Sequence, residues 1–238
     1  MTAICAENAK KPVLVSSHRL SSSQRMLLKS AGDRYEKAGK ERLVLNGTLD
    51  SFNNGTKAGS SPARITIEFP DQVKIENLGN GERVNFDGTS VQKSSGSASK
   101  QDLDFLETLL NDSTDGFFAA SLRRASIQSR GAFFKFTDNG KTGYCNLFEL
   151  REPVKVRGTS QPSAKIYCFD SFTGLLRSVR YYSGSTKIEI RFGDWIVVNG
   201  QSIPKTIARL ENGKQTLGFG ASVAATVASA PDGLFARP

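Results

Sequence analysis

The sequence predicts a mainly β protein in which a curved antiparallel sheet forms an incomplete barrel and helices cover its concave face. Three observations indicate this fold: apolar and polar residues alternate along many short segments, turn-forming residues separate these segments, and a few segments have a helical period instead. We expect about ten or eleven strands and about three helices. A meandering sheet of this size curls, and its concave side must then be covered.

The first predicted helix covers residues 20–38, where Leu27, Leu28, Ala31 and Tyr35 share one face. Residues 1–42 hold nine Lys or Arg and four Asp or Glu, so their net charge is 9 − 4 = +5. This charge favours peripheral contact with an anionic membrane surface. The alternative is an ordinary solvated helix face in a basic protein.

Alternating segments follow the helix. "RLVLNGTLD", "ARITIEF", "VKIEN" and "RVNFDG" each place apolar side chains on one face, with turns at Asn53-Asn54-Gly55 and Asn80-Gly81 between them. The apolar positions that we expect to face the interior are Leu43, Leu45, Ile65, Ile67, Val73, Ile75 and Phe86.

Residues 100–124 have a helical period. A stripe formed by Leu103, Leu106, Leu109 and Leu110 predicts one helix, and a second should carry Phe117 and Phe118. The acidic residues of the first helix, Asp102, Asp104 and Glu107, are expected on its solvated side.

Strands return after residue 125. "IYCFDSFTGLLRSVRY", from Ile166 to Tyr181, predicts a hairpin in which Asp170 forms the turn and Gly174 adopts a positive φ. In "TKIEIRFGDW", Ile188, Ile190 and Phe192 alternate with charged residues, and Asn199-Gly200 marks a further turn. The sequence therefore continues as one sheet to its C-terminal end.

Two of the three cysteines, Cys145 and Cys168, lie in predicted strands that are close enough in sequence order to pair. A disulfide between them would imply an oxidising compartment such as a periplasm. The alternative is that both are buried thiols that pack as small hydrophobic side chains.

Motifs for catalysis are absent from the sequence. The single histidine, His18, has no cluster of Cys or carboxylate residues around it, and neither a Gly-x-Ser-x-Gly elbow nor a phosphate-binding glycine loop occurs. We therefore expect a protein that is not an enzyme and needs no cofactor and no metal. Aromatic residues alternate onto the apolar face instead of lying among the basic residues, which argues against nucleic-acid binding.

Four segments resemble the LolA-like superfamily of outer-membrane lipoprotein-sorting proteins and related lipoproteins. They are "LLNDSTDGFF", "YCFDSFTGLLRSVRYYSG", "IEIRFGDWIVVNGQSIPKTI" and the closing "DGLFARP". The resemblance implies a half-barrel with an apolar concave side, covered by helices that move when an acyl chain enters. It also implies a location in the periplasm or anchored to the outer membrane. The N-terminal residues lack the apolar segment of a signal peptide, so we expect the leader peptide to be absent from this chain.

These observations lead to a hypothesis of lipid or acylated-lipoprotein binding by a monomer. We expect residues 1–19 to be a leader remnant or extension and residues 20–238 to form a single LolA-like domain. The alternative is a non-enzymatic envelope scaffold or sensor lipoprotein whose cavity is filled by its own helices. The predicted cavity-lining residues are Leu43, Leu45, Ile65, Ile67, Val73, Ile75, Phe86, Leu106, Leu110, Phe117, Phe118, Ile188, Ile190 and Phe192.

Overall fold

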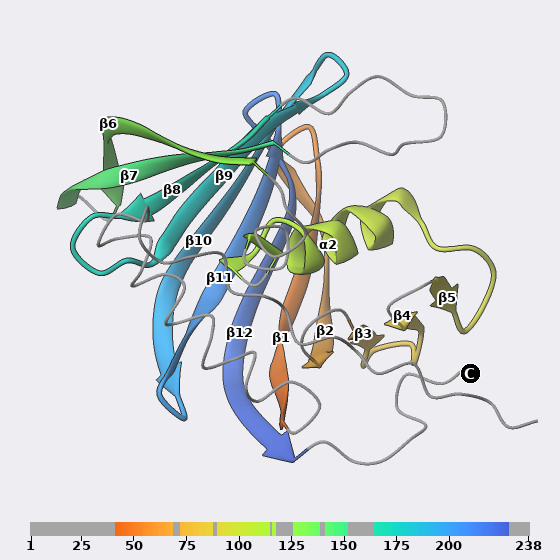
Figure 1. Cartoon of the computed structure of the whole chain (residues 1–238). Coiled ribbons are helices and arrows are strands. Elements are labelled where there is room, and N and C mark those ends of the chain that lie inside the picture. Colours follow the sequence, from red (N-terminus) through yellow and green to blue (C-terminus); the bar gives the residue numbers. More distant parts are fainter. Residues whose placement is uncertain are drawn as a thin grey trace, which may run out of the picture.

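The computed structural model describes residues 41–68, 72–87, 90–114, 116–117, 126–138, 141–151 and 164–228. The elements in this part of the chain are one 12-stranded antiparallel sheet and one helix, α2 (Lys100–Leu110) (Figure 1). The mainly β, antiparallel fold predicted from the sequence is confirmed. The sheet is open, and strands β5 and β6 form its two edges.

The strands follow the chain in two groups. The first group is β1 (Glu41–Asn53), β2 (Thr56–Glu68), β3 (Gln72–Asn77), β4 (Arg83–Asp87) and β5 (Val91–Lys93). The second group is β6 (Ser126–Asp138), β7 (Lys141–Arg151), β8 (Lys165–Asp170), β9 (Leu176–Ser183), β10 (Thr186–Val198), β11 (Gln201–Glu211) and β12 (Lys214–Ala228).

The described residues form twelve strands instead of the ten or eleven expected. The additional strand is β5, whose three residues are too few to show alternation. The helices expected at residues 20–38 and after residue 112 lie outside the described residues, except for Ser113, Thr114, Gly116 and Phe117. The helix that is described is too short and too polar to cross a membrane.

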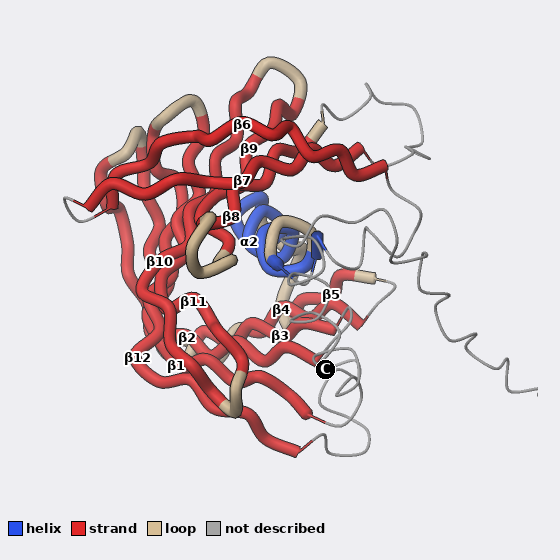
Figure 2. Tube along the Cα trace, turned by 60° about the vertical axis from the view of Figure 1, so that its left-hand side comes forward, coloured by secondary structure: helices blue, strands red, loops and turns tan. Residues whose placement is uncertain are grey.

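The order of the strands places the helix inside the curve of the sheet. The order is β5-β4-β3-β2-β1-β12-β11-β10-β9-β8-β7-β6, so the first and last strands pair in the middle. The chain leaves one edge at β5 and enters the other edge at β6, and α2 lies on the connection between them. Viewed along the sheet, the strands curve around α2 (Figure 2).

Three two-residue turns hold the long hairpins in register. They are Asn54-Gly55, Asn199-Gly200 and Asn212-Gly213, and each residue has a positive φ. Positive φ at both central residues is typical of the type I′ turn, whose twist matches that of the adjoining strands. The turns expected at Asn54-Gly55 and Asn199-Gly200 are therefore confirmed.

The pairing of β1 with β12 contains a β-bulge between Asn46 and Gly47. At this point the two backbones approach closely: a Cβ atom on Gly47 would lie 2.1 Å from the carbonyl oxygen of Gly220. Only glycine fits such an approach without moving the strands. A bulge also increases local twist, so it contributes to the curvature of the sheet.

Helix α2 begins with a capping box and turns one apolar face to the sheet. The Ser99 hydroxyl accepts a hydrogen bond from the Asp102 amide (3.1 Å), and the Asp102 carboxylate accepts one from the Ser99 amide (2.8 Å). Phe105, Leu106 and Leu109 are buried. Leu103 is 44% exposed, so the prediction that it belongs to the apolar stripe is wrong. Phe105 takes that place.

The β8–β9 hairpin has the turn that the sequence predicts. One Asp170 carboxylate oxygen accepts hydrogen bonds from the amides of Phe172 (2.9 Å) and Thr173 (3.0 Å). The other oxygen accepts from Arg177 (3.0 Å), and Gly174 has a φ of 71°. Asp170 therefore fixes the turn and also orients an arginine.

Cys145 and Cys168 form a disulfide between the neighbouring strands β7 and β8, and their Cα atoms are 5.2 Å apart. Both cysteines are buried. Of the two alternatives that the sequence left open, the structure contains the bridged one.

Substitution of Phe105 tests how strongly the sheet holds α2. Truncation of a buried Phe leaves a cavity, so we expect Phe105→Ala to lower the free energy of unfolding by about 3–5 kcal/mol. The matched control on the same helix, Leu103→Ala, should change it by about 0.5 kcal/mol or less, since surface substitutions have small effects. Urea denaturation followed by circular dichroism measures both. Equal losses from the two variants would contradict the packing described here.

Candidate ligand-binding site on the concave face

The concave face of the sheet is lined by apolar residues that the strand register places side by side. Leu45 lies opposite Ile65, Ile65 lies opposite Ile75, and Ile75 lies opposite Val84. In the other half of the sheet, Ile190 lies opposite Val179. Because side chains alternate between the two faces, these positions all point to the side on which α2 lies.

The structure brings the predicted cavity-lining residues together in one apolar cluster. Those that are buried in it are Leu45, Ile65, Val73, Ile75, Leu106, Phe117, Ile188, Ile190 and Phe192, and those that pack against it are Leu43, Ile67, Phe86 and Leu110. Phe118, the remaining predicted residue, lies outside the described residues.

An aromatic group at one end of the cluster was missed from the sequence. The Phe117 ring centroid lies 4.7 Å from that of Tyr167, 5.3 Å from that of Phe169 and 6.1 Å from that of Phe148. The alternation in "IYCFD" places Tyr167 and Phe169 on one face, which is the signal that could have identified them. Phe105 similarly packs on Phe219, at a centroid distance of 5.9 Å.

Polar contacts hold the C-terminal end of α2 against the sheet. Asp112, just after the helix, is fully buried and accepts hydrogen bonds from Lys165 (2.7 Å) and from the Tyr181 hydroxyl (3.0 Å). The Tyr167 hydroxyl donates to the Asn111 carbonyl (3.0 Å). The contacts are charge-assisted or buried, which makes them stronger than their exposed equivalents.

The middle of the helix has a second polar contact, made by Arg209 of β11. This arginine is buried on the concave face, where it contacts Asp104 of the helix (3.3 Å) and the Tyr181 hydroxyl (3.4 Å). Lys100 adds an ion pair to Asp104 (2.6 Å) and another to Glu211 (2.9 Å). The prediction that Asp104 lies on a solvated helix side is therefore wrong.

Burial dominates the electrostatics of this network. It raises the pKa of Asp112, and the charge and hydrogen bond of Lys165 oppose the rise without cancelling it. Burial raises the pKa of Glu107 as well, and the charge of Asp112 adds to that shift. The pKa of Tyr181 is raised by burial and by the same two carboxylates, so its hydroxyl keeps the proton that it donates to Asp112.

The arrangement is suited to holding an apolar group beneath a helix. The concave face has a continuous apolar lining, and its polar residues are engaged in fixing α2. Within the described ranges, no group of three or more His, Cys, Asp or Glu residues is placed to hold a metal ion.

Comparison with solved structures identifies the fold. A LolA superfamily protein from Nitrosomonas europaea matches 92% of this chain and 99% of its own, with a TM-score of 0.57 and 10% identity. A domain named for outer membrane lipoprotein sorting, from Vibrio parahaemolyticus, matches 87% of this chain and 94% of its own, with a TM-score of 0.50 and 10% identity.

A third structure, a DUF1329 family protein from Desulfovibrio piger, matches 86% of this chain and 93% of its own, with a TM-score of 0.53 and 11% identity. No protein-family model matches the sequence, and no curated protein matches it. The chain thus shares the fold of LolA superfamily and lipoprotein-sorting domains over most of its length, as the resemblance in the sequence predicts.

The raised pKa of Glu107 should make the free energy of unfolding depend on pH. A carboxyl group whose pKa is higher in the folded chain than in the unfolded chain favours folding in its protonated form. Its full contribution to the free energy of unfolding is present below the unfolded pKa, and this contribution is lost as pH rises through the folded pKa. Glutamine mimics the protonated form at every pH. We expect Glu107→Gln to gain stability relative to the wild type as pH rises above the ordinary glutamate pKa of 4.5.

Urea denaturation of both proteins at intervals between about pH 4 and pH 8 measures this difference. A difference in unfolding free energy that stays constant over the whole range would show that burial does not shift the titration of Glu107.

Proposed function

We propose that this protein binds the acyl chains of a lipid or an acylated lipoprotein between the concave face of the sheet and helix α2. It acts as a monomeric carrier in the bacterial envelope, without catalysis and without a cofactor. The observation that carries the proposal is the continuous apolar cluster that the concave face shares with the amphipathic helix α2. The likeness in fold to a lipoprotein-sorting domain supports it.

The energetics favour such a ligand. Each methylene that moves from water into an apolar site gains about 0.8 kcal/mol, so one acyl chain supplies several kcal/mol after the cost of ordering it. The lining has no need of a polar group that reads the ligand. Apolar contact alone is enough for binding, and selectivity then depends on chain length and shape.

Ligand entry requires α2 to move. Phe105 and Leu106 occupy the space between helix and sheet, where they are 1% and 2% exposed. An acyl chain would lie between these side chains and the sheet, so each side chain loses its contact with the sheet and gains a contact with the ligand. The Gly- and Ser-rich segment before Ser99 gives the helix a connection that can accommodate the movement.

The disulfide supports a location in the periplasm or at the outer membrane. Disulfides persist in oxidising compartments and are rare in reducing ones. Cys145 and Cys168 are bridged across neighbouring strands in the structure. The fold shared with a domain named for outer membrane lipoprotein sorting agrees with this location.

The second candidate is a scaffold or sensor lipoprotein whose cavity is filled by its own helix. The complete burial of Phe105 and Leu106 against the sheet favours it, because the protein already satisfies its concave face without a guest. In this case α2 stays in place, and the partner binds elsewhere on the molecule.

Uptake of a fluorescent long-chain fatty acid separates the two candidates. A carrier should bind the probe with saturation, and native mass spectrometry should find lipid that co-purifies with the protein. Leu106→Gln should weaken binding by about tenfold, since it replaces a buried apolar contact with an amide.

Leu103→Gln is the matched control, because it makes the same change on the exposed side of the same helix. It should leave probe binding unchanged. A wild-type protein that carries no lipid and takes up no fatty acid would contradict the carrier and favour the scaffold.

A further inference from the structure

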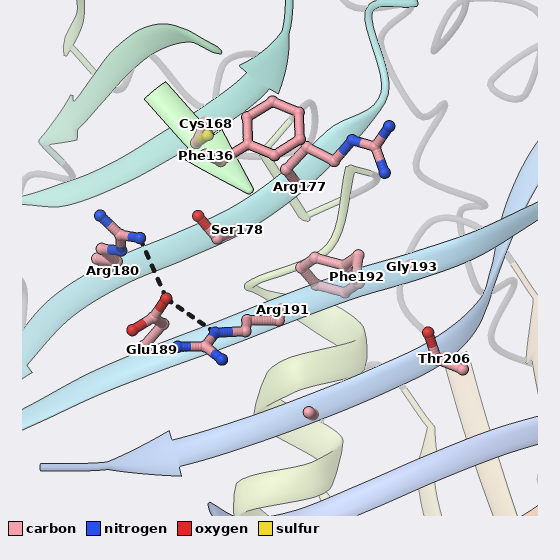
Figure 3. Close-up of a pocket in the computed structure, with 11 residues that line it drawn as sticks. Phe136, Cys168, Arg177, Ser178, Arg180, Glu189, Arg191, Phe192, Gly193 and Thr206 are labelled. Carbon is pink, nitrogen blue, oxygen red and sulfur yellow. Dashed lines mark hydrogen bonds and ion pairs between the residues drawn. The ribbon is translucent and has the colours of Figure 1, made fainter. Parts of the chain in front are cut away.

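A pocket with three arginines lies on the convex face of the sheet, on the side opposite to α2. Its volume is about 400 Å³, and its charged lining residues are Arg177, Arg180, Arg191 and Glu189 (Figure 3). Phe136 and Cys168 line one side of it. The pocket therefore takes in residues of β6, β8, β9, β10 and β11.

The strand register explains how a hollow arises on an outer face. Arg191 lies opposite Ser178 on one neighbouring strand and opposite Ala208 on the other, and Gly193 lies opposite Thr206. Four small residues thus surround one long arginine and leave space above the sheet. A Cβ atom on Gly193 would lie 2.8 Å from the Thr206 hydroxyl oxygen, so glycine keeps this part of the floor open.

Glu189 holds two of the arginines in place. Its Oε1 atom accepts two hydrogen bonds, one from Arg191 Nε (3.0 Å) and one from Arg180 Nη2 (3.1 Å). Burial opposes the ionisation of Glu189, but the contacts from Arg191 and Arg180 lower its pKa, so it stays charged. The two guanidinium groups and this carboxylate together carry a net positive charge.

Arg177 is fixed at the other end of the pocket. Its guanidinium donates to the Asp170 carboxylate (3.0 Å) and lies over the Phe136 ring, 5.2 Å from the ring centroid. Asp170 in turn is held by the turn of the β8–β9 hairpin, and the nearby disulfide joins β8 to β7. The arginines are therefore oriented before any ligand arrives, which lowers the entropic cost of binding.

We propose that this pocket binds a phosphate group through Arg191, with Arg180 and the Thr206 hydroxyl as further donors. A guanidinium presents several N–H donors in one plane and pairs with phosphate through two parallel hydrogen bonds. The Arg191 side chain is 58% exposed, so its terminal N–H groups are accessible to a ligand. The floor of hydroxyl and small residues suits a compact oxyanion better than an apolar group.

The phosphate can come from two sources, a phospholipid headgroup at a membrane surface or a soluble phosphate ester. The chemistry at the pocket is the same for both. The site lies on the other face of the sheet from the acyl-chain site, and it does not depend on whether the concave face binds lipid.

Two probes test the proposal and separate the sources. Glycerol 3-phosphate represents the soluble ester, and vesicles of phosphatidylglycerol, compared with vesicles of phosphatidylcholine, represent the anionic headgroup. Isothermal titration should show saturable binding of glycerol 3-phosphate, and co-sedimentation should show preferential binding to phosphatidylglycerol. Either response supports the site and identifies its source.

Arg191→Gln should weaken the response by about tenfold or more, because it removes a charge-assisted hydrogen bond. Arg83→Gln is the matched control, because it removes one positive charge, as Arg191→Gln does. Arg83 is 52% exposed, pairs with Glu76 and lies on β4, far from the pocket. This variant should bind as the wild type does. If Arg191→Gln does not fold, Thr206→Val removes only the hydroxyl and should still weaken binding about two- to tenfold.

The proposal is overturned if the wild type responds to neither probe. It is also overturned if Arg83→Gln weakens binding as much as Arg191→Gln does, since the attraction would then be a property of the net charge of +9 and not of the pocket.

Discussion

The pairing of β1 with β12 is the constraint on which the rest of the structure depends. It joins the first and last strands in the middle of the sheet, so β5 and β6, which lie midway along the chain, become the two edge strands. The chain must cross from one edge to the other, and α2 lies on that crossing. The helix that covers the apolar concave face is thus held by its connections to β5 and β6 and by its side-chain contacts with the sheet.

The two faces of the sheet differ in chemistry because each strand alternates between them. In β10, Ile188 and Ile190 face the helix, and Glu189 and Arg191 face outward into the arginine pocket. The same strand therefore serves an apolar interior and a polar recess. Polar contacts of Asp112 and Arg209 position α2 on the inner face, and ion pairs of Glu189 and Asp170 position arginines on the outer face.

Local patterns in the sequence predicted most of the strands, the turns at Asn54-Gly55 and Asn199-Gly200 and the apolar lining, because these depend on neighbouring residues. What depends on distant residues was not predicted. Leu103 and Phe105 both fit a helical stripe, and only the position of the sheet decides which one is buried. The contact of Tyr181 with Asp112 spans 69 residues and that of Arg209 with Asp104 spans 105, so neither leaves a local signal. The arginine pocket likewise requires the register of three strands.

Hydrogen exchange of α2 tests most directly whether an acyl chain displaces this helix from the sheet. An 11-residue helix is marginally stable in water without tertiary contacts, so it should lose protection when it leaves the sheet. Mass spectrometry of peptides that cover Lys100–Leu110 should show faster exchange when a long-chain fatty acid is bound than when the protein is free. Bound fatty acid with unchanged exchange in this helix would contradict the account.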